Sequence, residues 1–446
     1  MAMRSHPWHR LLAVLPVLVS GCVLLDLGNV PQQQRKIDSA CRIEGTVGTR
    51  GNPDHALVVV LARLTGPDPH SRSSWSLADH FVLERAGRWQ FFTGDGTYGV
   101  VAFEDANADL RYEAGEPYRR IREGELVQCT AGKHVSGIDL VVSADDRPRE
   151  EGDVIDVAAL QARTAGDQVQ VTLGEVTAVG EVTSMDDPRF TDEVAAIGLW
   201  RPFDFLFDYH PGIYLLKPYD PGKIPVVFVH GIAGNPANFR TMIERLDRRR
   251  FQPFLYFYPS GGRLDVIADH LTQTMMKLEA RYGIRRFYVV AHSMGGLTAR
   301  GFVLRHGALA ERVDIPLFVT LSTPWNGHKA AAQGVELSPA VVRVWYDMAP
   351  GSAYLTSLYY ADAEKRVPVR LGPATAHHLM FSFRSSGTLS IGEANDGTVT
   401  VSSQLRQEAQ RDAVRLYGFD ETHMGILESR EAWSVLEGLL NDPAAR

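Results

Sequence analysis

The sequence predicts an α/β domain with a mostly parallel sheet, preceded by a small antiparallel β-sandwich. Apolar runs between residues 42 and 142 are short and are separated by Gly, Asp and Pro, as is typical of sandwiches. From residue 224 onward, apolar strands alternate with helical stretches, which requires parallel strands joined by right-handed crossovers. A chain of 446 residues is long enough for both domains.

Composition describes an ordinary globular protein. Hydrophobic residues make up 45% of the chain and charged residues 22%. The formal net charge is −7, and no block of Lys and Arg stands out. Nothing therefore indicates a nucleic-acid partner.

The first 21 residues have the pattern of a targeting segment. Arg4 and Arg10 make its start basic, and the apolar run over residues 11–19 is too short to span a bilayer. The following Val-Ser-Gly-Cys, ending at Cys22, resembles the lipobox of bacterial lipoproteins. The alternative is a plain secretory signal with a chance cysteine.

The lipobox resemblance implies cleavage before Cys22 and a lipid on its thiol, which would anchor the chain in the bacterial cell envelope. The next residues are Val23 and Leu24 rather than Asp. Under the Gram-negative sorting rule this favours the outer membrane, on its periplasmic or surface face. Residues 22–36, with Pro31 and three glutamines, are expected to form a tether.

The β-domain is expected over residues 37–143. Six or seven short strands predict a sandwich that resembles the transthyretin-like domains attached to bacterial surface enzymes. With Cys22 lipidated, Cys41 and Cys129 remain as one pair in an oxidising compartment, so a disulfide is expected. The alternative is two buried free thiols. A protein partner of this domain is not identified.

An acidic loop in the β-domain has the spacing of an EF-hand calcium loop. Leu110 occupies the position where Gly normally makes the turn, and no helices flank the loop. The alternatives are a structural Ca²⁺ site and a hairpin turn rich in Asp and Asn. The oxygen ligands at loop positions 1, 3, 5, 9 and 12 would be Asp105, Asn107, Asp109, Glu113 and Glu116, with the backbone carbonyl of Arg111 at position 7.

A charge run within residues 144–165 predicts a solvated linker. The second domain is therefore expected over residues 166–446. Its central feature is Ser293, which follows an apolar strand and precedes a helical pattern. Ala291 and Gly295, two residues before and after it, are small enough for the strand and helix to close on each other. This is the pattern of a nucleophile elbow, although small-x-Ser-x-Gly also occurs by chance.

A second motif supplies donors for an oxyanion. His230 and Gly231 end a buried apolar strand that precedes the elbow in the chain. Ester cleavage passes through a tetrahedral oxyanion that two backbone amides can stabilise. We expect those amides to belong to Ile232 and Met294. The alternative for the His-Gly pair is a strand-ending turn.

A serine nucleophile needs a histidine base and a carboxylate that orients it, and in this fold they follow in the order Ser, acid, His. Asp396 in Asn-Asp-Gly-Thr and His423 in Thr-His-Met meet that order on loops after apolar segments. The rival acids are Asp347, Asp362 and Asp412, the last expected on a solvated surface, and the rival bases are His377 and His378.

These motifs together resemble the lipase and esterase branch of the α/β-hydrolases, over roughly residues 224–440. The resemblance implies a carboxylic ester hydrolase with no catalytic metal. An insertion at about residues 326–365 contains short apolar helices. In lipases such helices form a cap over an acyl-chain pocket; the alternative is extra core helices.

The expected function is a membrane-anchored serine hydrolase that acts on lipid or other acyl esters. Lipase, phospholipase and acyltransferase activities share these motifs and stay open, as does peptide hydrolysis. A different class is a binding or scaffold lipoprotein with a vestigial hydrolase core. The intact motif set, from His230 to His423, weighs against it.

Overall fold

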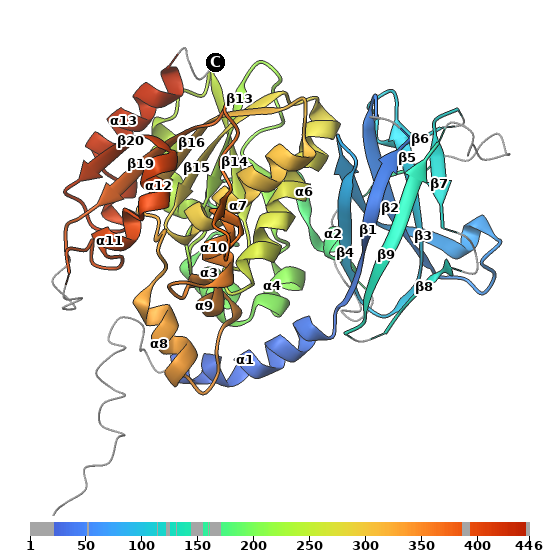
Figure 1. The fold of residues 1–446 in the computed structure, drawn as a ribbon, viewed down its shortest axis with the longest axis horizontal. Helices are drawn as coiled ribbons and strands as arrows, with labels where there is room; N and C mark the ends of the chain where they lie inside the picture. The colour runs from blue at the N-terminus through green and yellow to red at the C-terminus, as the bar shows by residue number, and fades with distance from the viewer. Residues whose placement is uncertain are drawn as a thin grey trace, which may run out of the picture.

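The computed structural model describes residues 22–50, 53–113, 115–121, 125–130, 132–143, 155–158, 160, 171–385 and 393–442. The targeting segment expected over residues 1–21 lies outside this part. Figure 1 shows a β-domain and an α/β domain side by side, with helix α1 (Cys22–Asp38) running along their lower edge.

The β-domain is built on two facing sheets, and its strand β6 pairs outside them with a later strand. The smaller has the strand order β4-β1-β9, in which β1 is antiparallel to β4 but parallel to β9. The larger is antiparallel, with the order β3-β2-β5-β7, and β8 also pairs with β5. The strands are β1 (Cys41–Thr49), β2 (Ala56–Leu64), β3 (Trp75–Leu83), β4 (Gly87–Thr93), β5 (Gly96–Asp105), β6 (Arg111–Tyr112), β7 (Tyr118–Arg120), β8 (Val127–Cys129) and β9 (His134–Val142).

Strand β2 shows why its sequence is apolar at every position from 56 to 62. Leu57, Val59 and Leu61 face the core between the two sheets. Val58 and Val60 face the other way and pack in a cluster that contains Met276 of helix α6 (Leu264–Tyr282). Because successive strand side chains point to opposite faces, a strand buried on both faces loses the usual alternation.

A disulfide joins the two sheets of the β-domain. Cys41 in β1 and Cys129 in β8 are bonded, with their Cα atoms 5.8 Å apart. They are the pair expected from the sequence, and both are buried.

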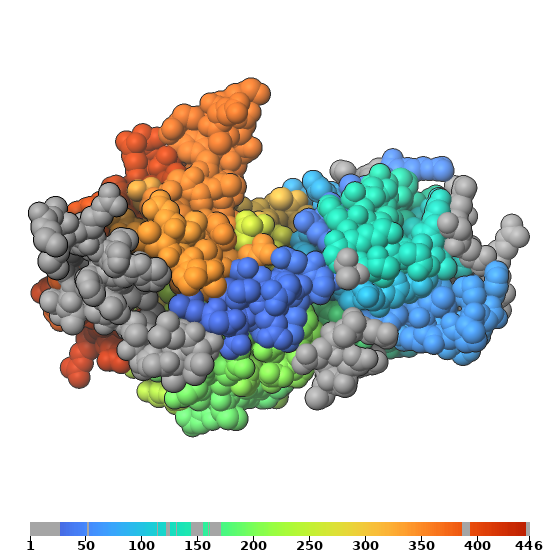
Figure 2. Space-filling model, turned by 90° about the horizontal axis from the view of Figure 1, so that it is seen from below, coloured from blue at the N-terminus to red at the C-terminus, as the bar shows by residue number. Residues whose placement is uncertain are grey.

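Helix α1 occupies the segment that was expected to be a tether. Figure 2 shows it lying between the cap helices and the segment of residues 192–208. Gln33 and Lys36 bond the Asp204 carboxylate at 2.8 and 2.9 Å, and Asp38 pairs with Arg343 of the cap. Val30 is 3% exposed within the α/β core. The sequence interpretation missed this helix because its anchoring contacts come from residues far along the chain.

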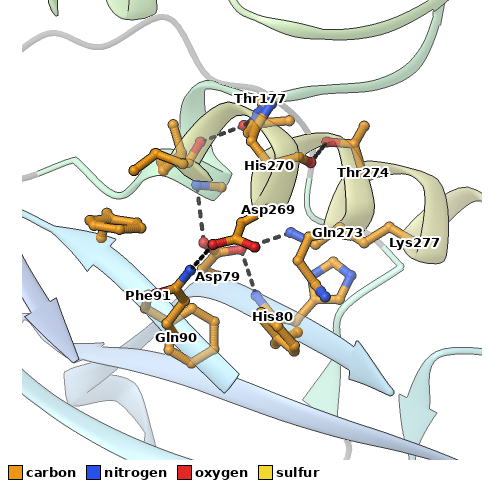
Figure 3. A pocket seen from close by; sticks show the side chains of 15 residues that line it. Asp79, His80, Gln90, Phe91, Thr177, Asp269, His270, Gln273, Thr274 and Lys277 are labelled. Carbon is orange, nitrogen blue, oxygen red and sulfur yellow. Dashed lines mark hydrogen bonds and ion pairs between the residues drawn. The ribbon is translucent and has the colours of Figure 1, made fainter. Parts of the chain in front are cut away.

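The two domains meet between the β-sandwich and helix α6, where a small cavity lies. Lys277 on α6 and Asp79 on β3 form an ion pair at 2.9 Å. Gln90 on β4 donates to Asp269 on α6 at 2.9 Å. Figure 3 shows Asp79, His80 and Gln90 on the strands below and Asp269, Gln273 and Lys277 on the helix above. Buried apolar and charged contacts thus bind the domains together.

Most of the expected linker over residues 144–165 lies outside the described residues. Its described part includes β10 (Ile155–Asp156), which pairs with β6 of the β-domain. The α/β domain then begins with α2 (Leu173–Val176). Glu175 in this helix forms an ion pair at 2.9 Å with Arg63 of the β-domain.

The α/β domain is built on an eight-stranded sheet with the order β11-β12-β14-β13-β15-β16-β19-β20. The six neighbouring strands β14, β13, β15, β16, β19 and β20 are parallel. Strand β12 is antiparallel to β14, and β11 is parallel to β12. The bounds are β11 (Ala178–Val182), β12 (Gly212–Leu215), β13 (Ile224–Val229), β14 (Phe251–Phe257), β15 (Arg286–His292), β16 (Asp314–Leu321), β19 (Ala376–Ser382) and β20 (Ala413–Phe419). The predicted fold class is confirmed.

Helices cover both faces of this sheet. In β13, Val227 and Val229 pack in the cluster that contains α6 and α7 residues, while Val226 and Phe228 pack in the opposite cluster with α5 and α13. This alternation fixes the strand at the centre of the domain. The covering helices are α3 (Asp192–Trp200), α4 (Pro202–Asp208), α5 (Arg240–Arg245), α7 (Met294–Leu309), α11 (Val401–Gln404), α12 (Gln407–Asp412) and α13 (Arg430–Asn441).

The insertion after β16 is helical, as the sequence predicts. It contains α8 (Lys329–Leu337), α9 (Arg343–Met348) and α10 (Ala353–Ser357), followed by a hairpin of β17 (Tyr360–Asp362) and β18 (Val367–Pro368). Trp345 of α9 packs edge-on against Trp200 of α3, which ties the insertion to the domain. In the described part of the chain, no helix is both long and apolar enough to cross a bilayer.

Candidate active site

Ser293 lies at a sharp break between strand and helix. Strand β15 ends at His292, and α7 begins at Met294. Ser293 has φ 55° and ψ −133°, a strained conformation for a residue with a side chain. Its amide donates to the carbonyl oxygen of Leu321 in β16 at 2.8 Å, which holds the strained turn against the sheet.

Two glycines make this turn possible. A Cβ added to Gly295 would lie 2.3 Å from the carbonyl oxygen of His230 and 2.4 Å from that of Val229. A Cβ on Gly231 would lie 2.9 Å from the Ser293 Cβ. The strand β13, its following turn and helix α7 therefore touch backbone to backbone. Of the two small elbow residues read from the sequence, Gly295 is required by this contact.

The structure brings the three predicted residues Ser293, His423 and Asp396 together in one hydrogen-bonded chain. His423 Nε2 lies 2.8 Å from Ser293 Oγ, and His423 Nδ1 lies 2.8 Å from Asp396 Oδ2. Asp396 follows β19 and His423 follows β20, so both loops leave the carboxyl edge of the sheet next to the elbow. Asp396 is fully buried, and Ser293 and His423 are 4% and 7% exposed.

The carboxylate of Asp396 is held by groups that sequence reasoning missed. Its Oδ2 also accepts from Ser382 Oγ at 2.8 Å and from Gln404 Nε2 at 3.2 Å. Its Oδ1 accepts from the amides of Thr398 and Val399 at 3.0 and 2.7 Å. Burial by itself would raise the pKa of Asp396, but its hydrogen bonds and the attraction of His423 bring that pKa below its usual value. The acid is thus kept ionised.

The rival acids and bases are engaged elsewhere. Asp347 bonds Arg263 at 2.9 Å, and His377 is buried beside Thr320 at 2.9 Å. Asp362 lies in the β17–β18 hairpin and accepts a hydrogen bond from the Lys365 amide at 2.9 Å. Asp412 pairs with Arg300, and its side chain is 7% exposed, so the expected solvated position is wrong. Arg300, 112 residues away along the chain, draws Asp412 inward.

The predicted oxyanion donors flank the serine. Met294 directly follows Ser293, and Ile232 directly follows Gly231, whose backbone approaches the Ser293 side chain. Neither amide donates a hydrogen bond to another described residue. The Ala233 amide donates to Ser260 Oγ at 3.0 Å, which braces the turn that carries Ile232. The oxyanion role of these two amides stays a prediction.

Chemically, this arrangement can activate a hydroxyl. His423 donates its Nδ1–H to Asp396, which leaves the Nε2 lone pair toward Ser293 Oγ, so Nε2 can take the serine proton. The developing negative charge would lie at the N-terminus of α7, where backbone amides favour an anion.

The comparisons with known proteins agree with this fold. The family model of the alpha/beta hydrolase fold matches residues 224–338, which contain the turn after β13, the elbow and the start of the cap. The chain has the α/β-hydrolase fold. Among curated proteins, none matches this chain.

Several solved structures are similar to the hydrolase domain. A mature lipase of Bacillus licheniformis is 19% identical, with 51% of this chain and 97% of its own covered and a TM-score of 0.39. Lipase B of Aspergillus fumigatus is 15% identical, with 52% and 56% covered and a TM-score of 0.39. An enol-lactonase of Burkholderia xenovorans is 14% identical, with 52% and 96% covered and a TM-score of 0.34. At these scores, the neighbours do not define a substrate.

Within the α/β-hydrolase domain, His328 links the cap to the acid loop. It is the residue before α8, and its Nδ1 accepts from the Ala330 amide at 3.2 Å. Its Nε2 donates to the carbonyl oxygen of Thr398 at 2.7 Å, two residues beyond Asp396. The first cap helix therefore starts beside the hydrogen-bonded chain of Ser293, His423 and Asp396. No spacing in the sequence signals this contact.

The predicted calcium loop in the β-domain is organised by its own backbone. Asp105 accepts from the amides of Asp109 and Leu110 at 3.2 and 3.1 Å, and Glu116 accepts from Ala106 and Glu113 at 2.8 and 3.0 Å. Leu110 has φ 59°, the left-handed conformation that Gly usually supplies. No group of three or more His, Cys, Asp or Glu among the described residues is placed to hold a metal. The Ca²⁺ site stays a prediction.

Proposed function

We propose that the chain is a serine hydrolase that cleaves carboxylic esters, with Ser293 as nucleophile, His423 as general base and Asp396 as the orienting acid. Two hydrogen bonds of 2.8 Å, which link Asp396 to His423 and His423 to Ser293, carry the proposal together with the strained backbone of the serine. A residue with a side chain held in such a backbone conformation costs about 1–3 kcal/mol, and such residues cluster at active sites. The combination at the carboxyl edge of the sheet is that of acyl transfer.

The reaction follows from the positions of these groups. Ser293 Oγ attacks the ester carbonyl carbon as its proton passes to His423 Nε2. The amides of Ile232 and Met294 stabilise the oxyanion, each contributing about 2.7–4 kcal/mol in sites of this type. Protonated His423 then gives its proton to the leaving alcohol, and an acyl-enzyme forms. Water, activated by the same histidine, releases the acid and restores Ser293.

We propose acyl esters of lipids as the substrate class. The support is the apolar surrounding of the oxyanion turn. Ile232 and Ala233 pack against the cluster that contains Trp200 and the cap residue Val342. The cap helices would cover an acyl chain beside Ser293, as lids do in lipases. A pocket of this kind binds a chain by burial of apolar area.

The decisive experiment combines an activity-based probe with an ester series. A fluorophosphonate probe should label the wild-type chain and fail to label Ser293→Ala, whereas Ser73→Ala, which changes an exposed serine of the β-domain, keeps full labelling. p-Nitrophenyl esters of two to sixteen carbons then report the acyl length. Cleavage that peaks at long chains and vanishes in Ser293→Ala supports a lipid substrate, and a peak at two to four carbons rejects it. Labelling of Ser293→Ala would overturn the assignment of Ser293 as the nucleophile.

We further propose that Cys22 carries a lipid that anchors the enzyme in the outer membrane of a bacterial envelope. The support is the lipobox-like sequence before it. Cys22 starts α1, which packs on α4 and whose Asp38 pairs with Arg343 of the cap. Metabolic labelling with an alkyne fatty acid should mark the wild-type chain and not Cys22→Ser. Equal labelling of both would show that the thiol carries no lipid.

A further inference from the structure

A second cavity lies on the α/β domain between the β17–β18 hairpin and helix α12. Its volume is about 260 Å³. The polar side chains that line it include Tyr359, Arg366, Arg370, Glu408, Arg411 and Asp412. It is assembled from the end of the cap insertion and from the helix before β20, so no single stretch of sequence announces it.

The cavity has more positive charge than its carboxylates neutralise. Asp412 accepts from Arg370 at 3.0 Å and also pairs with Arg300, which lies behind it. Its two oxygens are therefore both occupied. Arg370, whose side chain is 63% exposed, also lines the cavity.

The second carboxylate is occupied in the same way. Glu408 bonds Arg406 at 2.9 Å and accepts from the Tyr360 hydroxyl at 2.8 Å, with Arg366 3.6 Å away. Arg411 forms no ion pair with any described residue. Three arginines and two carboxylates line the cavity, and both carboxylates are also paired with Arg300 and Arg406, which are not among the lining residues. The lining therefore carries excess positive charge in a chain whose net charge is −7.

Two buried donors at the same place lack partners among the described residues. They are the Tyr359 hydroxyl and Nη1 of Arg300, and their side chains are 3% and 0% exposed. The Tyr359 ring lies between the guanidinium groups of Arg300 and Arg406, at 4.2 and 4.7 Å from its centre. Buried donors are almost always satisfied in folded proteins, by protein, water or a bound group. Excess charge and unmet donors both indicate an anion.

The cavity is separate from the site of Ser293. Asp412 immediately precedes β20, whereas His423 lies four residues beyond its end at Phe419. A strand of seven residues spans roughly 23 Å at about 3.3 Å per residue. The two sites therefore lie toward opposite ends of β20, and a ligand in one does not occupy the other.

We propose that this cavity is a binding site for a phosphate monoester group. Guanidinium groups present planar forks of N–H donors that match phosphate oxygens, and several arginines around one group favour a dianion. The volume leaves room for a small organic part such as glycerol. A soluble phosphomonoester and a phospholipid headgroup share this chemistry.

Titration calorimetry on the purified full chain tests the site. Inorganic phosphate and glycerol phosphate are the probes, at low salt. We expect binding that Arg370→Gln and Arg411→Gln each weaken at least tenfold, while Arg430→Gln, an exposed arginine at the start of α13, leaves it unchanged. Ser293→Ala should bind as tightly as the wild type, so a failed hydrolase proposal does not affect this result. No binding, or equal losses in Arg430→Gln, would overturn the proposal.

The source of the phosphate is resolved with vesicles. Cys22→Ser removes the proposed anchor, and its flotation with phosphatidylcholine vesicles is compared with and without phosphatidic acid. A preference for phosphatidic acid that is lost in Arg411→Gln assigns a lipid headgroup. Arginine-dependent binding of glycerol phosphate without that preference assigns a soluble ligand. Absence of arginine dependence in both arms rejects the site.

Discussion

The ring of His292 holds the loop that carries the proposed base, because its Nε2 lies 2.8 Å from the backbone carbonyl oxygen of His423. A carbonyl only accepts, so Nε2 carries the proton. Burial lowers the pKa of His292 to about 3, which keeps the ring neutral in this donor form at ordinary pH. His292, the residue before the proposed nucleophile, thereby positions the backbone of His423, the proposed base.

Replacing His292 should reduce turnover without unfolding the chain. His292→Leu removes the donor, and the freed loop misplaces His423 relative to Ser293. A displacement of about 1 Å in such a site can cost roughly 10²-fold in rate. We expect a fall of that order in kcat with little change in KM, measured on a p-nitrophenyl ester.

A conservative variant separates positioning from folding in this test. His292→Gln retains an N–H donor on a side chain of similar reach and should recover part of the lost turnover. Circular dichroism should match the wild type for both variants. Full activity in His292→Leu would show that the bond to His423 has no role.

Gly295 should tolerate no side chain. An added Cβ would lie within 2.4 Å of two carbonyl oxygens of the β13 turn, so Gly295→Ala must push α7 away from the sheet. We expect a loss of unfolding free energy of more than about 2 kcal/mol and loss of probe labelling at Ser293, since overpacking and backbone displacement act together.

The matched control is another helical glycine. Gly438 in α13 has nothing within 4 Å of an added Cβ. Gly438→Ala should stabilise the chain by up to about 1 kcal/mol, because Ala is the better helix former. Urea unfolding measures both variants. Equal stability of Gly295→Ala and the wild type would contradict the close contact.

Acid should destabilise the fold through buried neutral histidines. Burial lowers the pKa of His230 to about 4 and of His270 to about 3. In the unfolded chain the pKa is about 6.5, so between pH 6.5 and pH 4 the unfolded state binds more protons. Each such histidine then lowers the unfolding free energy by about 1.4 kcal/mol for every pH unit below 6.5.

Urea unfolding at pH 7 and pH 5 measures this effect. The midpoint should fall at pH 5, and His270→Asn should show a smaller fall between the two pH values than the wild type. The same midpoint at both pH values would contradict neutral burial of these rings.

Loss of the Cys41–Cys129 disulfide should weaken the β-domain. The bond joins residues 88 apart and links two sheets. Closing a loop of this length restricts the unfolded chain, and its removal typically costs about 2–5 kcal/mol. Cys41→Ser with Cys129→Ser should lower the melting temperature. Cys22→Ser serves as the control and should leave it unchanged; equal melting of all three would contradict the prediction.

The motifs and their order predicted the α/β domain and the residues near Ser293. An elbow needs small residues at fixed neighbours of the serine, and that local requirement is visible as Ala291 and Gly295. The short apolar runs between residues 42 and 142 likewise predicted strands of the β-domain. Such features depend on contacts close in sequence or on the repeat of a single strand.

Ser382 and Gln404 show why the rest stayed hidden. Both bond the Asp396 carboxylate, yet each is an ordinary polar residue in its own segment. Only the neighbouring ends of β19 and α11 place them at one carboxylate. Helix α1 was missed for the same reason, because Asp204 and Arg343, its partners, lie in other elements.

The sequence by itself determined the fold class, the elbow and the order of serine, acid and histidine, since periodicity and steric limits act along the chain. Only the tertiary structure decided which groups each charged side chain pairs with. Asp412 is expected in solvent from its polar helix, but Arg300 takes it into a buried pair beside the arginine-lined cavity. A buried carboxylate needs a cationic partner and hydrogen-bond donors, and these come from other parts of the fold. Which residues supply them depends on tertiary packing, which no local sequence pattern predicts.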